Sequence, residues 1–381
     1  MEVEYLRLGE LFSGPGGLAK GALEAESEGD SKILRIRHAW ANDLDPSSCQ
    51  TYSYNICGKE DSDSVICGDV KNLDLNALGQ IDLFAFGFPC NDFSIVGKQK
   101  GFHGEYGALY SYGVQIMNIY KPKAFIAENV GGIISANEGK AFKQILEDLQ
   151  NSGDGYNLTV HKYKSEEYGV PQTRHRYIIV GIDKSLGLKY RVPATTNANN
   201  YVTAREALSG IPENALNNEL KKMSERVVRR LEHIRPGENA WTAVLPEDLK
   251  LNVKSARMSQ IYKRLDPDLP SYTITGSGGG GTHGYHYDEP RALTNRERAR
   301  IQTFQDDYRF FGGIEKVRRQ IGMAVPPKLS KIIFTALLNT LNEVPYAYIE
   351  PNYNISDNLW SAQKSGKPKK MPLLECQTRL A

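Results

Sequence analysis

Short apolar runs alternate with helical stretches over the first 183 residues, and this alternation constrains the fold of the chain most. Strands are predicted near Leu6–Phe12, Leu34–Asn42, Ser64–Cys67, Ile81–Phe86, Ala124–Glu128, Asn157–Lys164 and Tyr177–Gly181. Helices are predicted at Gly16–Glu28, Pro46–Asn55, Leu109–Tyr120 and Lys140–Asn151. Such alternation is typical of an α/β fold in which helices cover both faces of a parallel sheet. The last two strands are predicted to form a long hairpin that ends the sheet.

The character of the chain changes after Asp183. Residues 184–290 mix short strands, basic helical stretches and the glycine tract Gly276–Gly281, which predicts an inserted, separately packed domain. Helical spacing of apolar residues returns at Leu293–Phe304 and at Lys328–Leu341. The expected divisions are therefore a catalytic domain at 1–183, the inserted domain at 184–290, a return to the first domain at 291–345 and a poorly ordered tail at 346–381.

Composition narrows the compartment and the partners. The chain has no apolar run of about 18 residues and no N-terminal basic segment followed by an apolar stretch, so neither a membrane span nor a secretory signal is predicted. Its five cysteines are scattered without a CxxC pair, which favours a reducing compartment with no disulfide framework and no zinc site. The net charge of +2 means that a nucleic-acid partner would need local basic patches.

A glycine-rich turn, FSGPGGL at Phe12–Leu18, follows the first predicted strand and opens the first helix. Glycines at such a bend let the backbone approach a ligand closely, although a plain turn is the alternative. Asp43 and Asp69 stand at the ends of the next two strands, where their carboxylates could accept from a ribose diol and from an adenine amino group. Together these groups predict a cofactor that contains adenosine. The GxGG spacing lacks the third spaced glycine of a dinucleotide site, which disfavours an oxidoreductase.

The segment GFPCNDFS, at Gly87–Ser94, places Cys90 just past the end of a predicted buried strand. Open α/β sheets carry their reactive groups at this edge, and Pro89 ends the strand and directs the thiol. A buried structural cysteine is the alternative.

The turn, the acids and the cysteine segment together resemble the DNA (cytosine-5)-methyltransferase family. Further matching segments are ENV at Glu128–Val130, QTRHR at Gln172–Arg176, RALTNRERARIQTF at Arg291–Phe304 and QIGMAVP at Gln320–Pro326. The motifs occur in the family's order, and the segment between them is where the family keeps its target-recognition domain. Asn91 replaces the commoner Gln, and Met323 replaces the Asn of the usual GNAVP. The resemblance implies a Rossmann-like S-adenosylmethionine-dependent methyltransferase sheet with an inserted, smaller target-recognition domain.

The resemblance also implies roles for individual residues. Cys90 would add to carbon 6 of cytosine, because covalent catalysis places electron density on carbon 5. Glu128 would protonate or hydrogen-bond ring nitrogen 3, Arg174 would reach the cytosine carbonyl, and Arg176 would support Glu128 or a loop. The residues expected to bind S-adenosyl-L-methionine and its product S-adenosyl-L-homocysteine are Phe12, Ser13, Gly14, Pro15, Gly16, Gly17, Leu18, Asp43, Leu44, Asp69, Val70, Phe88, Pro89, Leu109, Met323 and Val325. No metal is expected.

Duplex DNA is the expected substrate, and its target base must be flipped into the pocket. Residues 94–106 have the glycines of a mobile lid, with Ser94, Lys98 and Lys100 toward phosphates; a flexible surface loop is the alternative. The glycine tract, with Gly278, Gly279, Thr282 and His283, resembles a recognition loop for the major groove; a linker is the alternative. Basic stretches at 226–235, 296–300 and 316–319 are expected to supply the DNA footprint.

The predicted function is methyl transfer to carbon 5 of a cytosine in a specific duplex DNA sequence, protecting host DNA in a restriction-modification system. We expect a cytoplasmic monomer that acts on DNA, with a cognate endonuclease that it need not contact. A methyltransferase of structured RNA such as tRNA is the nearest alternative. A catalytically silent DNA-binding relative is a second, against which the cysteine, the ENV glutamate and the two arginines all argue.

Overall fold

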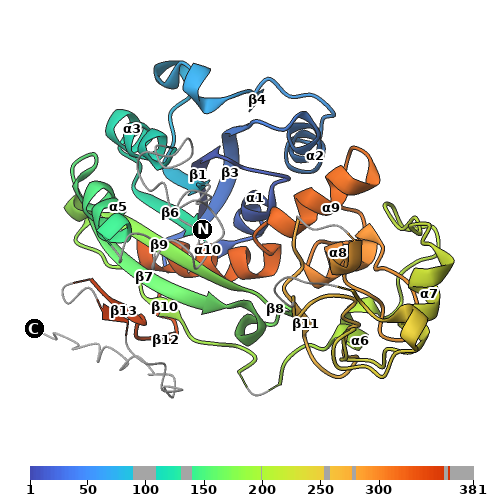
Figure 1. Ribbon diagram of the computed structural model, residues 1–381. Helices are drawn as coiled ribbons and strands as arrows, with labels where there is room; N and C mark the ends of the chain where they lie inside the picture. Colours follow the sequence, from blue (N-terminus) through green and yellow to red (C-terminus); the bar gives the residue numbers. More distant parts are fainter. Residues whose placement is uncertain are drawn as a thin grey trace, which may run out of the picture.

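The computed structural model describes residues 1–88, 109–129, 140–198, 200–252, 258–276, 280–355 and 359–360. A large sheet at its centre has the strand order β2-β3-β1-β5-β6-β9-β7, and β4 pairs with β3 (Figure 1). Its strands are β1 (Glu2–Leu11), β2 (Glu26–Glu28), β3 (Lys32–Asp43), β4 (Val65–Cys67), β5 (Leu83–Gly87), β6 (Ala124–Asn129), β7 (Tyr156–Lys164) and β9 (His175–Asp183). All seven strands predicted for this region are therefore confirmed, with bounds shifted by a few residues.

Most of the sheet is parallel, but its far edge is not. β1 pairs in parallel with β3 and β5, and β5 with β6, whereas β9 is antiparallel to both β6 and β7. The predicted hairpin is thus confirmed, and its second strand is inserted between β6 and the first. The 3-10 helix η5 (Ser165–Tyr168) and the short strand β8 (Gln172–Thr173) lie in its connection.

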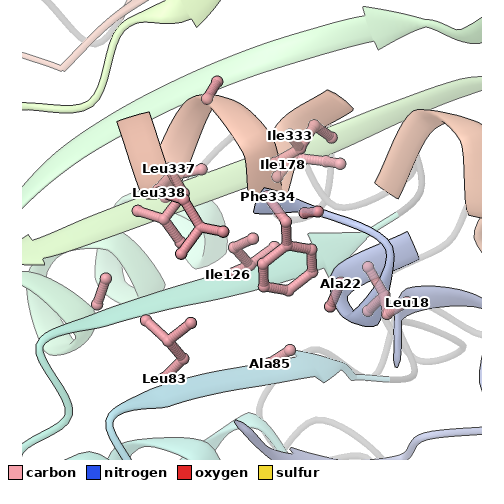
Figure 2. Close-up of a cluster of buried hydrophobic side chains, with 14 of the residues drawn as sticks. Leu18, Ala22, Leu83, Ala85, Ile126, Ile178, Ile333, Phe334, Leu337 and Leu338 are labelled. Atoms are coloured by element: carbon pink, nitrogen blue, oxygen red, sulfur yellow. The ribbon is translucent and has the colours of Figure 1, made fainter. Parts of the chain in front are cut away.

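Two apolar layers cover the sheet because its inner strands bury side chains on both faces. Leu83 and Ala85 of β5 face one layer, built with α1 (Gly17–Leu23) and α10 (Pro327–Leu341), and Figure 2 shows Phe334 of α10 in this layer. Phe84 and Phe86 face the other layer. That layer contains α3 (Tyr110–Tyr120) and α5 (Lys140–Asn151). α2 (Pro46–Cys57) begins with the cap of Asp45, whose side chain accepts from the Ser48 amide, and with Pro46 in its first turn.

The predicted helix Gly16–Glu28 is wrong beyond Leu23. The chain leaves α1 there, and Glu26–Glu28 form β2, which pairs antiparallel with β3. The Glu26 carboxylate lies 3.0 Å from the Arg35 guanidinium on that strand. Pairing with the edge of the sheet, a tertiary interaction, therefore overrides the local helical preference.

Between residues 184 and 323 the elements are short, and those after residue 200 gather beside the sheet, whereas Tyr190 and Val192 belong to the apolar layer that α10 covers (Figure 1). They are β10 (Val192–Pro193), α6 (Ala204–Leu208), α7 (Glu225–Glu232), β11 (Ser271–Tyr272), α8 (Asn295–Ile301) and α9 (Ile314–Met323), with the 3-10 helices η6 (Lys184–Leu186), η7 (Glu247–Leu249) and η8 (Gly280–Thr282). Apolar clusters separate from those of the sheet hold this region together. β11 pairs in parallel with β8, which joins the region to the catalytic sheet.

The last described residues pack against the sheet. β12 (Tyr348–Ile349) pairs with β10, and β13 (Tyr353–Asn354) pairs with β14 (Leu359–Trp360). The Asn352 side chain accepts from the Lys162 amide at 2.8 Å, which covers the free side of β7. The prediction of a poorly ordered tail is therefore wrong for residues 346–355.

One helical stretch, 314–341, is by length and composition apolar enough to cross a membrane, but 72% of its most apolar window is buried within the protein. It comprises α9 and α10, which are separated at Ala324–Pro326. Since α10 supplies side chains to the sheet's apolar layer, we interpret the stretch as core.

Candidate functional site

The glycine-rich turn joins β1 to α1 in a backbone conformation that few sequences adopt. Phe12, Gly14 and Gly16 all have positive φ, at 56°, 55° and 90°. At Gly17 a Cβ atom would lie 2.3 Å from the Val325 carbonyl oxygen, so only glycine allows α1 to approach the segment after α9 this closely. The sequence GxGG is therefore required by the turn itself and by the helix packed on it.

Asp43 fixes the turn from the end of β3. Its Oδ2 accepts from the Gly14 amide at 2.8 Å, and its Oδ1 accepts from the Asp45 amide at 2.9 Å. Burial raises the pKa of Asp43. At the end of β4, Asp69 accepts from the Lys71 amide at 3.0 Å. Both predicted acids thus stand at neighbouring strand ends beside the turn, each with a backbone amide bound; a carboxylate retains further lone pairs for a ligand.

Several features of this end of the sheet fit an adenosine-bearing ligand. The Ser13 hydroxyl is buried without a hydrogen-bond partner among the described residues, a condition that a ligand would relieve. A Cβ placed on Gly14 would meet no atom within 4 Å, which leaves room above the turn. Leu44 is 67% exposed, so it offers an apolar surface beside the two carboxylates.

The remaining residues predicted for cofactor binding divide by burial. Met323 is 62% exposed at the end of α9. Val70, Phe88, Leu109 and Val325 are buried in the structure, and Pro89 lies outside the described residues. Where the structure describes the chain, no cluster of three or more His, Cys, Asp and Glu side chains could hold a metal ion.

Glu128 and Arg176 form an ion pair at the same edge of the sheet. The Glu128 Oε1 lies 2.7 Å from the Arg176 Nε, and both side chains are largely buried. Glu128 pairs in register with Gly87 of β5, the strand that leads toward Cys90, and Asn129 donates to the Phe88 carbonyl at 3.1 Å. Neighbouring strand ends therefore bring Glu128 and Asn129 to the start of the cysteine segment. Cys90 itself lies outside the described residues.

Arg174 has a different environment from Arg176. It lies between β8 and β9 rather than within a strand, and it is fully buried. Its two terminal nitrogens donate to the carbonyls of Ile274 and Gly322, each at 3.0 Å. Burial, together with the nearby Arg176, lowers the pKa of Arg174 well below its usual value. Because both terminal nitrogens already donate to backbone carbonyls, the role that the sequence predicted for Arg174, contact with the cytosine carbonyl, stays a prediction.

Two glutamines complete a buried polar junction around Arg174. Gln172 accepts from the Ile274 amide at 2.7 Å and donates to Gln302 at 2.6 Å. Gln302 in turn donates to the Ile321 and Ala324 carbonyls. The junction ties the catalytic sheet, the segment before the glycine tract and the end of α9 together. No local sequence signal indicates Gln302, because its acceptors are backbone carbonyls that any residue provides.

The predicted DNA-binding residues are only partly described. Ser94, Lys98, Lys100, Gly278 and Gly279 lie outside the described residues, as does the predicted lid at 94–106. Thr282 ends η8. The nearby His283 imidazole is hydrogen-bonded through Nδ1 to Arg318 Nη1. Burial and the surrounding cations lower the pKa of His283 to about 4.

The basic stretch at 296–300 does not form an exposed patch, contrary to its prediction as DNA footprint. Arg296 and Arg298 are buried, and Arg300 pairs with Asp306 at 2.5 Å. The Arg296 guanidinium donates to the carbonyls of Leu216, Gln305 and Tyr308, each at 2.8 Å. These arginines hold backbone segments together.

Comparisons with known proteins identify the family that the chain is similar to. The family model described as "C-5 cytosine-specific DNA methylase" matches residues 6–339. The chain is 59% identical to Type II methyltransferase M.BbvI of Brevibacillus brevis, over 91% of this chain and 95% of that protein. It is 43% identical to Type II methyltransferase M.NgoFVII of Neisseria gonorrhoeae, over 84% and 82% of the two chains.

Among solved structures, the fold is similar to a putative DNA modification methyltransferase encoded within an Escherichia coli prophage. The TM-score is 0.67 at 24% identity, and the match covers 88% of this chain and 99% of that one. This likeness supports a Rossmann-like methyltransferase sheet.

Proposed function

The chain belongs to the family of C-5 cytosine-specific DNA methylases and is a DNA (cytosine-5)-methyltransferase of the type II restriction-modification kind; on this premise we propose how its residues carry out the reaction. The observation that carries the proposal is the Glu128–Arg176 ion pair, formed where β6 ends beside the strand that leads to Cys90. The glycine-rich turn stands at the end of β1, which is the next strand of the sheet.

S-adenosyl-L-methionine is the methyl donor that we propose for the glycine-rich turn. When bound, it supplies an electrophilic methyl group on a sulfonium sulfur. The amides and hydroxyl of Ser13–Gly17 would hold its polar end, while Asp43 and Asp69 accept hydrogen bonds from the ribose and the adenine. Leu44 would cover the adenine ring with its exposed side chain. Val70, Phe88, Leu109 and Val325 are buried and would shape the pocket wall from below.

Cys90 carries the covalent step in this proposal. Its thiolate adds to carbon 6 of the flipped cytosine, and ring nitrogen 3 takes a proton from the Glu128 carboxyl, so that carbon 5 becomes nucleophilic. Once carbon 5 carries the methyl group, its remaining proton leaves to water and the thiolate is expelled from carbon 6. Glu128 takes back the proton of nitrogen 3, which returns the enzyme to its starting state.

The burial of the two arginines suggests different roles for them. Arg176 contacts Glu128 directly, so we assign to it the orientation of that carboxyl and the contact with the cytosine carbonyl. Arg174 already donates both terminal nitrogens to backbone carbonyls, and we assign to it the positioning of the strand that carries Arg176. This assignment keeps the support of Glu128 that the sequence predicted for Arg176 and moves the contact with the cytosine carbonyl from Arg174 to Arg176.

The substrate in this proposal is a specific sequence of duplex DNA, and the setting is protection of host DNA in the cytoplasm. Residues 184–290 would act as the target-recognition domain, with the glycine tract, Thr282 and His283 toward the duplex. We propose that the enzyme acts as a monomer and meets a cognate endonuclease only through shared sites on DNA.

Transfer of tritiated methyl groups from S-adenosyl-L-methionine tests the function. Wild-type protein should label duplex DNA of mixed sequence, and the Cys90→Ser variant should not. Glu128→Gln should lower single-turnover labelling by about 10²- to 10⁴-fold, the range for a lost general acid. Absence of label on DNA, or stronger labelling of tRNA than of duplex DNA, would contradict the proposal. Bisulfite sequencing of the labelled DNA then identifies the cytosine.

A further inference from the structure

The connection between α8 and α9 reaches the glycine-rich turn through one side chain. Tyr308 is buried, and its hydroxyl donates to the carbonyl of Pro15 in the middle of the turn. The same hydroxyl oxygen lies 2.9 Å from the position that a Cβ of Gly16 would occupy. The Pro15 carbonyl therefore has a fixed direction, set from a segment far away in sequence.

Tyr308 is itself held by the recognition region. Arg296 donates 2.8 Å hydrogen bonds to the Tyr308 carbonyl and to the Leu216 carbonyl. The Asn217 side chain donates to the Phe310 carbonyl and accepts from the Phe310 amide, each at 3.1 Å. Residues 308–310, the Tyr308 segment, are thus tied to residues 216–217 and Arg296. The groups that make these bonds on the Tyr308 segment are the Tyr308 carbonyl and the carbonyl and amide of Phe310.

The other side of the Tyr308 segment is fixed to α2. Asn55 donates to the Arg309 carbonyl at 2.8 Å and accepts from the Arg309 amide at 2.9 Å. On the same helix Tyr52 donates to Glu10 of β1 at 2.5 Å, and its ring lies 3.1 Å from the Cβ position of Gly16. Gly16 is therefore enclosed between two buried tyrosines, one from α2 and one from the α8–α9 connection.

We propose that Tyr308 is a positioning residue for cofactor binding, whose hydroxyl orients the Pro15–Gly16 peptide and so the turn that holds S-adenosyl-L-methionine. Its anchoring by Arg296 and Asn217 makes the cofactor turn depend on residues 216–217 of the recognition region. The inference rests on the proposed function, because it assumes that this turn binds the cofactor. Tyr308 touches neither substrate nor reacting atoms, and it acts through the backbone.

The test removes only the hydroxyl. Titration calorimetry with S-adenosyl-L-homocysteine should give a Kd about five- to tenfold higher for Tyr308→Phe than for wild type, the worth of one net hydrogen bond. The KM for S-adenosyl-L-methionine should rise by a similar factor while kcat is retained. The reason is that the hydrogen bond stabilises the bound ground state and the transition state equally. The Kd for duplex DNA without cofactor should stay unchanged.

Tyr163→Phe is the matched control. Tyr163 is as buried as Tyr308, and its hydroxyl bonds to that of Tyr190, at 3.0 Å, within the sheet's apolar layer. Removing this hydroxyl should lower the free energy of unfolding but leave the Kd for S-adenosyl-L-homocysteine within twofold of wild type.

Asn217→Ala provides a second variant in case Tyr308→Phe does not fold. It removes the two hydrogen bonds to Phe310 and leaves the turn itself unchanged. The Kd for S-adenosyl-L-homocysteine should rise about two- to threefold. Unchanged Kd in whichever of the two variants folds, or an equal rise in Tyr163→Phe, would overturn the inference. A wild-type protein that binds no S-adenosyl-L-homocysteine would contradict the proposed function, and the inference with it.

Discussion

The helices α7 and α8 each carry three arginines in a short stretch, and most of the α7 arginines have the opposite environment to those of α8. On α7, Arg226 and Arg229 are exposed and contact Asp248. Arg230 of the same helix is buried and donates to the Leu249 carbonyl. On α8, Arg296 and Arg298 are buried, and Arg296 donates to three backbone carbonyls. A run of arginines therefore does not identify a DNA-binding surface. Guanidinium groups present several fixed donors, which also suits them to satisfying carbonyls where loops meet.

The largest expected effect is on folding, at Arg296. Arg296→Met should lower the free energy of unfolding by about 3–5 kcal/mol, because the buried guanidinium is removed and three backbone carbonyls lose their donor. Urea unfolding followed by circular dichroism measures the loss. The matched variant Arg226→Met on α7 should stay within about 0.5 kcal/mol of wild type. Equal losses for the two variants would remove the distinction between the helices.

Acidic residues also differ between buried and exposed positions, and Glu10 is the buried example. Burial raises the pKa of Glu10 from 4.5 to about 8, although the Tyr52 hydroxyl donates a hydrogen bond to its carboxylate. Between these pH values the folded chain holds a proton that the unfolded chain has released. The contribution of Glu10 to the free energy of unfolding should therefore fall as the pH rises from about 4.5 to about 8. Half-buried His38 and buried His161 contribute with the opposite sign up to about pH 6.5, because burial lowers their pKa values, so the effect of Glu10 is measured as a difference between wild type and a Glu10 variant.

Glu10→Gln cannot ionise and should flatten this decline, gaining about 3 kcal/mol over wild type at pH 8 relative to pH 5. Thermal unfolding across this pH range measures it. The exposed Glu232 of α7 is the control, and Glu232→Gln should leave the slope unchanged. A stability difference between wild type and Glu10→Gln that does not change between pH 5 and pH 8 would show that Glu10 ionises normally in the fold.

The next effect separates the two arginines of the QTRHR segment. Arg176→Lys should lower single-turnover methyl transfer by about 10²-fold, since lysine cannot reproduce the guanidinium contact with Glu128, while unfolding changes by less than about 1 kcal/mol. Arg174→Lys should instead destabilise the fold by about 2–3 kcal/mol, as the Ile274 and Gly322 carbonyls lose their donors. The reverse pattern would restore the roles expected from sequence.

The smallest effect on stability belongs to α7. The double variant Arg226→Ala, Arg229→Ala should unfold like wild type to within about 1 kcal/mol. If both side chains contact phosphates, the slope of log K for DNA against log salt should fall in magnitude by about 1.8. Filter binding at several salt concentrations gives the slope. An unchanged slope would exclude α7 from the DNA footprint.

Local patterns predicted the sheet well because its strands are buried on both faces. The run Ile81–Phe86 contains only one charged residue, and it became β5 with its side chains divided between two apolar layers. The helix predicted through Glu28 failed because β2 depends on pairing with the distant edge of β3. The sequence also predicted Asp43 at a strand end, and it is the last residue of β3.

The supports of the site could not be predicted in this way. Gln302 and Tyr308 act by donating to backbone carbonyls of residues far away in sequence. Such acceptors have no sequence signature, because every residue provides a carbonyl. Likewise, the spacing of the arginines on α8 is compatible with exposed side chains. Arg296 is buried because the backbone of Leu216, Gln305 and Tyr308 packs around its guanidinium.

The position of α10 in the core has a consequence for synthesis of the protein on the ribosome. Its side chains cover β5, β6 and β9 and pack against α1, although the chain reaches α10 only at Pro327 (Figure 2). A nascent chain that ends anywhere before residue 327 therefore leaves one apolar face of the sheet in contact with water. This apolar face stays exposed while the recognition region is being translated, and transiently exposed apolar surface of this kind favours aggregation. Methyl transfer can begin only after the last helix has emerged.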